Sequence, residues 1–229
     1  MTFAAEGYAV IPGPLAGATL AVVRETVVEA VARADPGEVR IGSTSARVHG
    51  ILGRAPALGS LLDHAPLLEA AGAIVGGPFR MSSCHGRSLM PGASAEVLHQ
   101  DVATGVEAWP LAGFILMLDP FTERNGATRF VPGSRDLAEL PEVHLRPYPR
   151  EVSACGAAGS LIVFDGSTWH GHGANATADW RHSVQGAFIP RAAAPAVDFE
   201  RDLPAEIWRG LSTSAQLLLS RSCPDRNTR

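Results

Sequence analysis

The distribution of apolar and polar residues divides the chain near Phe79. Before this point, apolar residues recur at the three- and four-residue spacing of an amphipathic helix. We predict one helix from about residue 14 to residue 34 and a second from residue 58 to residue 75, with a restart at Pro66. Residues 7–11 are predicted to form a short strand. Residues 40–53 are predicted to form a strand or a loop that leads into one.

After Phe79, short apolar or alternating runs are separated by Gly, Pro, Asn and Asp about every ten residues, as is typical of a β-sandwich or barrel. The predicted strands are 79–84, 87–90, 96–102, 113–118, 128–131, 143–148, 160–164, 184–189 and 196–199. Together with the helices they indicate a mainly β fold with flanking helices. We expect a double-stranded β-helix, also called a jelly roll and cupin-like, in which helices cover one sheet.

The chain contains no internal repeat and no linker that would divide it. We therefore expect one domain over residues 1–229, with one or two short helices in 204–219 and a loose polar tail at 222–229.

The amino-acid composition excludes several classes of function. All 19 Lys+Arg residues are arginines, which excludes Schiff-base chemistry and a lysine phosphate loop. These arginines are scattered and the net charge is −4, so neither nucleic acid nor an anionic membrane is an expected partner. Cys84, Cys155 and Cys223 are widely separated. The first residues do not show a basic region followed by an apolar one, and no apolar run reaches about 18 residues, so we expect neither a leader segment nor a membrane span. We expect a reducing, cytoplasmic location.

Candidate chemistry begins with His99 and Asp101. Side chains two residues apart in an extended segment project to the same side, so this imidazole and carboxylate can converge on one point. A further imidazole, for which His170 is the candidate, would complete the two-histidine, one-carboxylate face that binds non-haem Fe(II). Arg181 is the candidate for holding the far carboxylate of an oxo-acid co-substrate.

His172 competes with His170, because both can face the same way in an extended segment. Only one imidazole fills the remaining facial position, and the metal and Arg181 must be separated by the length of a five-carbon diacid. We assign the metal to His170 and expect His172 beside the co-substrate carboxylate. His182 follows Arg181 directly and is expected to face the opposite side, in a structural role.

Several segments, taken in order, resemble the phytanoyl-CoA dioxygenase (PhyH) family of Fe(II)/2-oxoglutarate-dependent oxygenases. They are the pair His99 and Asp101, residues 125–134, the run 169–175 with Arg181, and more weakly residues 7–12 and 47–50. The resemblance extends from near the start of the chain to about Arg191.

The resemblance implies a jelly roll with iron bound by His99, Asp101 and His170, and with 2-oxoglutarate and O2 as co-substrates. It pairs Arg181 with the distal carboxylate of 2-oxoglutarate and suggests that Thr128 and Arg47 contact the same molecule. The chain departs from the family pattern at three positions. Arg135 stands where a histidine is usual, Glu96 where a glutamine is usual and His172 where a serine is usual.

Related halogenases lack the carboxylate ligand, so Asp101 favours hydroxylation, desaturation or ring formation over chlorination. The expected substrate is a small molecule, and the Ala-, Gly-, Pro- and Arg-rich composition suggests specialised metabolism. Candidate substrate-binding residues are Arg80, Ser82, His85, Trp109 and Arg135. Two alternatives stay open: a cupin-like metal enzyme that uses no oxo-acid, and a jelly-roll binding module without catalytic activity.

Overall fold

The computed structural model describes residues 3–102, 109–140 and 147–220. Most of the strand predicted at 143–148 and the whole tail predicted at 222–229 lie outside these residues. No helix in the described parts of the chain is long and apolar enough to cross a lipid bilayer.

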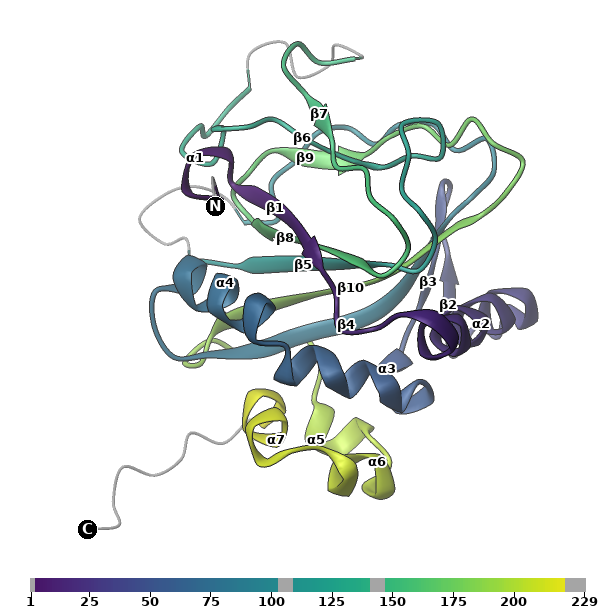
Figure 1. Ribbon diagram of the computed structural model, residues 1–229, viewed down its shortest axis with the longest axis vertical. Coiled ribbons are helices and arrows are strands. Elements are labelled where there is room, and N and C mark those ends of the chain that lie inside the picture. Colours follow the sequence, from purple (N-terminus) through teal and green to yellow (C-terminus); the bar gives the residue numbers. More distant parts are fainter. Residues whose placement is uncertain (1–2, 103–108, 141–146, 221–229) are drawn as a thin grey trace.

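The larger of two sheets contains seven strands in the order β1-β8-β5-β10-β4-β3-β2, and each neighbouring pair is antiparallel (Figure 1). Its strands are β1 (Tyr8–Pro12), β2 (Val39–Ile41), β3 (Ser45–Val48), β4 (Phe79–Leu89), β5 (Ala112–Met117), β8 (Ser160–Asp165) and β10 (Arg181–Pro190). Strands adjacent in this sheet come from distant parts of the chain, and this topology brings β10 beside β4 and β5.

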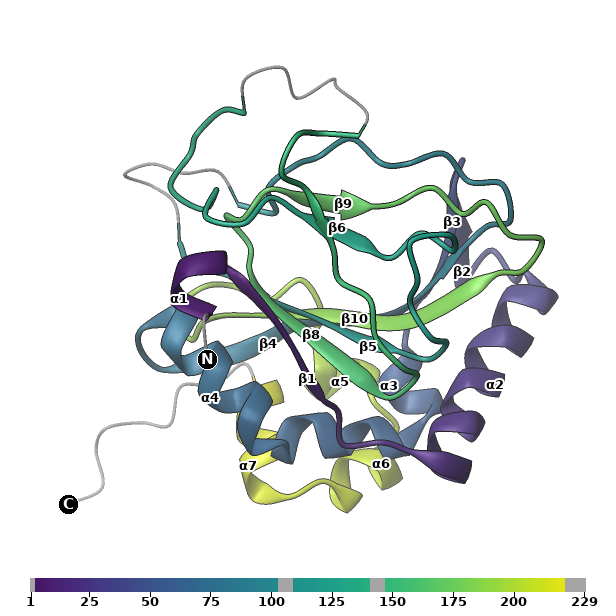
Figure 2. The same cartoon turned by 45° about the horizontal axis from the view of Figure 1, so that its top comes forward.

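The smaller sheet has the order β7-β6-β9 and faces the larger one (Figure 2). Its strands are β6 (Thr128–Phe130), β7 (Val152–Ser153) and β9 (His170–His172). An isolated antiparallel bridge between His99 and His170 adds the extended segment before residue 102 to its edge. The two sheets form the jelly roll.

Helices cover the outer face of the larger sheet (Figures 1 and 2). They are α2 (Gly17–Arg33), α3 (Ile51–Arg54), the 3-10 helix η1 (Pro56–Asp63) and α4 (Ala65–Val75). The short helix α1 (Phe3–Glu6) precedes β1, and three helices follow β10: α5 (Phe199–Asp202), α6 (Ala205–Gly210) and α7 (Thr213–Leu219).

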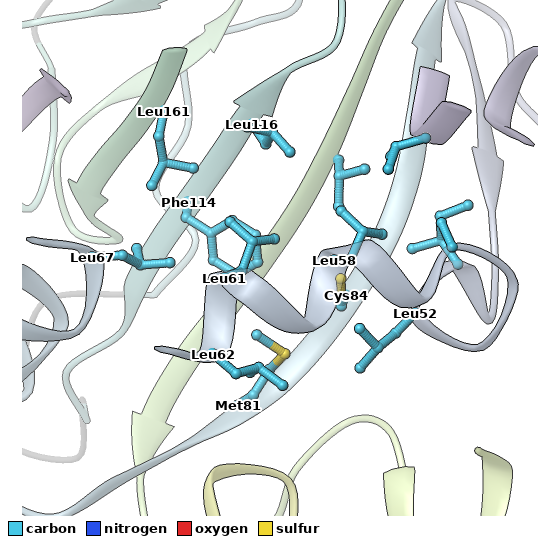
Figure 3. Packing of buried hydrophobic residues seen from close by; sticks show 14 of the residues in the cluster. Leu52, Leu58, Leu61, Leu62, Leu67, Met81, Cys84, Phe114, Leu116 and Leu161 are labelled. Carbon is cyan, nitrogen blue, oxygen red and sulfur yellow. The ribbon is translucent and has the colours of Figure 1, made fainter. Parts of the chain in front are cut away.

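The helices pack on the sheet through one continuous set of apolar side chains. In η1, Leu58, Leu61 and Leu62 are at most 1% exposed. They lie against side chains of β4, β5 and β8, among which Figure 3 labels Met81 and Phe114. Burying leucine side chains of this kind contributes roughly 1.5–3 kcal/mol each, so this layer anchors the helices to the sheet.

The inner face of the larger sheet is divided into an apolar half and a polar half. Toward β5 and β8, Ile115, Met117 and Ile162 pack with Phe130 of the smaller sheet. Toward β3, β4 and β10 the inward positions are mostly polar: Arg47, Ser83, His85, Arg87, Arg181 and Gln185. A cavity therefore forms over this half of the sheet, where the opposing side chains do not fill the space.

Four predicted strands differ in the structure. Residues 79–84 and 87–89 belong to one strand, β4, which ends at Leu89. Residues 96–102 form no regular strand, because their β-bridge to β9 at His99 is isolated and does not continue into a ladder. Residues 196–199 are not a strand either: the Asp198 side chain accepts a hydrogen bond from the Arg201 backbone and starts α5.

Candidate metal centre and cavity

Residues 99–101 are held in place by backbone hydrogen bonds to two other segments. His99 and His170 exchange a pair of N–H···O bonds of 2.9 Å each, and the Asp101 N–H donates to the Gly166 carbonyl at 2.8 Å. Gln100 points away from the centre, and its Nε2 donates to the Leu137 and Ser167 carbonyls. The two side chains flanking Gln100 are thereby directed to one side.

His99, Asp101 and His170 converge on one point. The Nε2 atoms of His99 and His170 lie 3.9 and 3.7 Å from oxygens of the Asp101 carboxylate. One ligand atom from each residue lies within 4.8 Å of the other two, a spacing that one metal ion can bridge.

The remaining ring nitrogens fix the orientation of both imidazoles. Nδ1 of His99 lies 3.0 Å from the Val97 carbonyl, and Nδ1 of His170 lies 2.8 Å from the Thr168 carbonyl. A carbonyl oxygen can only accept, so in each ring the hydrogen is on Nδ1 and the Nε2 lone pair faces Asp101. This is the tautomer and support expected of histidine ligands to a metal.

His170 is buried among aromatic rings. Its ring centroid lies 4.7 Å from that of Phe164 and 5.7 Å from that of Phe130. Burial lowers the pKa of His170, although the nearby Asp101 carboxylate opposes this effect. A neutral imidazole is the form that binds a metal, so this environment suits a ligand.

Arg181 lies at the start of β10 and is 1% exposed. Its Nε and Nη1 atoms are buried and have no hydrogen-bond partner among the described residues. Burial and the neighbouring Arg87 lower the pKa of Arg181 to about 9, against the opposing effect of Asp119 and Glu96. An unpaired buried guanidinium is costly, so a carboxylate bound here would gain strong, charge-assisted hydrogen bonds.

One cavity of about 360 Å³ contains the three ligand-type residues and Arg181 in its wall. Thr128, Arg47, His172 and His85 also line it, so the structure gathers eight of the residues singled out from the sequence. Thr128 and His172 are directly paired across β6 and β9.

Four of the five candidate substrate-binding residues lie outside the lining of this cavity. Arg80 is buried near the start of β4, beyond the lining residue Ser83. Trp109 is 43% exposed, and Arg135 is half exposed at the surface, where it pairs with Asp136 at 3.6 Å. Ser82, a further candidate, accepts a hydrogen bond from the Ala196 N–H and is likewise outside. The sequence showed residue types that suit a ligand but not the directions in which they point.

His172 binds no member of the ligand set and joins a separate polar group. Its Nε2 lies 3.4 Å from Thr44 Oγ1 and 3.8 Å from a Glu96 carboxylate oxygen. The same carboxylate accepts from Arg87 Nη2 at 3.3 Å and from the His172 backbone N–H. Burial favours neutral Glu96, but Arg87, His172 and His99 outweigh it and lower the pKa of this carboxyl group.

Arg87, Glu96 and Gln185 are lining residues that the sequence did not identify as part of the site. Arg87 is not identified from the sequence because the pattern predicts a break in the strand before this residue. In an uninterrupted strand, Arg87 falls two residues after His85 and therefore on the same face. The sequence marks Glu96 only as a departure from the family pattern. Gln185 could have been recognised as an inward-facing residue because it alternates with apolar or small residues along β10.

Comparison with known proteins agrees with this geometry. A model of the phytanoyl-CoA dioxygenase (PhyH) family matches residues 3–183. The multifunctional dioxygenase prhA of Penicillium brasilianum is 32% identical over 148 residues, which are 57% of this chain and 48% of that protein. The chain thus spans about half the length of the curated relatives it matches.

Solved structures share the fold. HygX from Streptomyces hygroscopicus, with nickel and 2-oxoglutarate bound, has 18% identity and a TM-score of 0.66, covering 84% of this chain and 86% of HygX. The epimerase SnoN, in complex with Fe3+, alpha ketoglutarate and nogalamycin RO, has 21% identity and a TM-score of 0.66, covering 89% and 88%. At these identities the likeness shows the fold alone, and the predicted jelly roll is confirmed.

Proposed function

Because this chain belongs to the phytanoyl-CoA dioxygenase family, we propose that it is an Fe(II)/2-oxoglutarate-dependent oxygenase that oxidises a small molecule. Iron would be held by His99, Asp101 and His170, and the distal carboxylate of 2-oxoglutarate by Arg181. Succinate and CO2 would be released as the substrate is oxidised.

One observation carries the proposal: a ligand set for a metal and an unpaired buried cation line the same cavity. The Nε2 atoms of both histidines are free to bind a metal because each Nδ1 is bound to a backbone carbonyl. Arg181 has buried donors without partners, and a dicarboxylate is a ligand that would satisfy them. A metal site without an oxo-acid would leave this guanidinium unexplained.

The residues have distinct roles. When bound, the iron would supply O2 activation coupled to decarboxylation of the oxo-acid. Arg181 would bind and orient the five-carbon diacid through parallel N–H···O bonds, and its burial keeps competing water away. Phe164 and Phe130 enclose His170 on its apolar side and fix the ring plane. Arg87 and Glu96 hold His172 against the cavity wall.

Hydroxylation of a specialised metabolite is the expected reaction. Support for the reaction comes from Asp101, which would fill the position that halogenases leave open. Support for the class of substrate comes from structural neighbours, one of which is named for a role in nogalamycin biosynthesis. HygX has been solved with hygromycin B, and SnoN, an epimerase, with nogalamycin RO. Desaturation and cyclisation use the same site, and one neighbour is named a carbocyclase.

The test is turnover of 2-oxoglutarate without a primary substrate. Protein loaded anaerobically with Fe(II) and then exposed to O2 should form succinate slowly, and His99→Ala protein should form none above background. Succinate formation at the same rate in both proteins would falsify the proposal. Arg181→Ala distinguishes the proposed oxygenase from the cupin-like alternative. Only an enzyme that binds the oxo-acid through Arg181 should require far more 2-oxoglutarate after this substitution.

A further inference from the structure

A second cavity, of about 460 Å³, adjoins the metal cavity. The two share three lining residues: Arg47, Ser83 and His85. Its other walls come from the start of α3 and from the segment 196–203, which contains α5. A volume of this size can hold a drug-sized molecule.

The two cavities meet at a gap in the edge of the larger sheet. Strand β3 pairs with β4 only at residues 86–89 of β4, and then turns away at His49 and Gly50. The C-terminal segment touches β4 further along, where the Val197 N–H donates to the Ser82 carbonyl at 3.0 Å. Between these two contacts, residues 83–85 pair with β10 along one edge but with no described strand along the other, and the second cavity lies along this open edge.

Apolar side chains form most of the second cavity, and its polar groups gather at the gap. Leu52, Val197, Phe199 and Leu203 supply the apolar wall. Asp202 is the one acidic residue of this wall among the described residues, and its carboxylate is already paired with Arg201 at 2.7 Å.

Arg47, an exposed residue of β3, supplies a positive charge at the gap. Arg47 makes no hydrogen bond or ion pair with any residue that the structure describes. Partial burial and the charges of Arg87 and Arg40 lower the pKa of Arg47, against the opposing effect of Glu96 and Asp101. Burial and the charges of Arg47 and Arg87 lower the pKa of His85 to about 3, so this imidazole stays neutral, and its Nε2 is buried without a partner among the described residues.

We infer that the second cavity binds the apolar body of the primary substrate, and that this substrate carries a carboxylate or similar anionic group that pairs with Arg47 at the gap. The inference rests on the proposed function, because it places the oxidised carbon in the adjoining metal cavity. In this inference Arg47 recognises the substrate, whereas the family resemblance suggests a contact with 2-oxoglutarate.

Two dyes of similar ring structure test the charge and the apolar wall separately. 8-Anilinonaphthalene-1-sulfonate is an apolar anion, and N-phenyl-1-naphthylamine is its analogue without the sulfonate. Both are titrated by fluorescence into protein loaded with Mn(II) and 2-oxoglutarate. Arg47→Gln should weaken binding of the anionic dye about tenfold, the loss of one charge-assisted pair, and leave the neutral dye within about twofold.

Two further variants control this result. Arg40→Gln removes an exposed arginine that faces Arg47 across β2 and β3 but lines neither cavity, and it should change neither dye. Leu203→Gln makes the apolar wall polar and should weaken both dyes. Binding of 2-oxoglutarate to the Mn(II) protein, followed by calorimetry, should stay within about twofold in all three variants.

The inference is overturned if wild-type protein binds neither dye, or if Arg47→Gln affects both dyes equally or neither of them. It is also overturned if Arg47→Gln weakens 2-oxoglutarate tenfold and spares the anionic dye, because Arg47 would then serve the co-substrate. If Arg47→Gln weakens only the anionic dye, as expected, but the wild-type protein binds no 2-oxoglutarate, the inference on the second cavity is supported and the proposed function is removed.

Discussion

The guanidinium carbon of Arg181 lies 4.0 Å from the centroid of the Phe121 ring. The nearby carboxylate of Asp119 is already occupied, by Arg24 Nε at 2.6 Å and by the His182 backbone N–H at 2.7 Å. The aromatic face thus supports the buried cation without consuming its hydrogen-bond donors. Arg181 is held in position and left available for an anion.

Replacing Arg181 with Met should separate binding of 2-oxoglutarate from stability of the fold. Loss of a buried charge pair costs about 3–5 kcal/mol, so affinity for 2-oxoglutarate should fall roughly 10²- to 10³-fold. Without 2-oxoglutarate the melting temperature should not fall, since an unpaired buried cation is removed. Calorimetry and thermal unfolding, with and without 2-oxoglutarate, measure both. A variant that is stabilised by 2-oxoglutarate as strongly as wild type contradicts this role.

Asp101→Ala should abolish tight metal binding without unfolding the chain. The carboxylate is partly exposed and its two close neighbours are the imidazoles of the site, so little packing is lost. Affinity for Mn(II), measured by electron paramagnetic resonance, should fall by more than the roughly 10–100-fold typical of supporting residues. His172→Ser is the matched control and should retain metal. Equal metal loading in both variants would remove Asp101 from the ligand set.

Gly113→Ala should disturb the metal centre through Phe164, because the ring of Phe164 lies next to both position 113 and His170. An added Cβ would lie 2.2 Å from the tip of the Phe164 ring, which packs against His170. Displacing this ring costs about 1–3 kcal/mol of stability and should weaken Mn(II) binding about tenfold. Gly77→Ala, where the added Cβ meets nothing within 4 Å, is the control. Unchanged metal affinity in Gly113→Ala would show that Phe164 does not position His170.

His85 should make the folded state sensitive to mild acid. Its pKa is lowered from 6.5 to about 3 by burial and by the charges of Arg47 and Arg87, with a smaller effect of His49. The resulting stability is fully present above pH 6.5 and is lost as the pH falls toward 3. The unfolding free energy should therefore drop by up to about 1.4 kcal/mol per pH unit in this window.

His85→Asn should remove that part of the acid dependence. Urea unfolding between pH 7 and pH 4 compares the two proteins, and histidine NMR signals report protonation of the ring directly. A His85 resonance that titrates near pH 6.5 in folded wild-type protein is incompatible with the buried neutral imidazole.

Leu61→Ala tests the attachment of η1 to the sheet. Leu61 is 1% exposed and lies against the sheet near Phe114 (Figure 3), so the substitution leaves a cavity. The unfolding free energy should fall by about 2–5 kcal/mol in urea titrations. Leu217→Ala, at a position 47% exposed, should cost much less. Similar losses at both positions would mean that η1 contributes little to the core.

The sequence by itself determined the class of fold and the order of the metal-binding residues. Alternation, turn residues and helical spacing are local properties, so they predicted β1, the helices α2 and α4, and the strands β4, β5, β6, β8 and β10. The ligand set followed because His99 and Asp101 are two residues apart, a spacing that fixes their common direction. Arg181 was identifiable by its distance along the chain from His170.

Only the tertiary structure decided which polar residues share a cavity. Whether Arg80, His85 or Arg87 faces the interior depends on where β4 is continuous and which strands pair with it, and these contacts are long-range. The pairing of β10 with β4 placed Arg181 near Arg87, and the early end of β3 opened the gap between the two cavities. Local patterns carry no information about these relations, because they arise when segments distant in the chain are packed together.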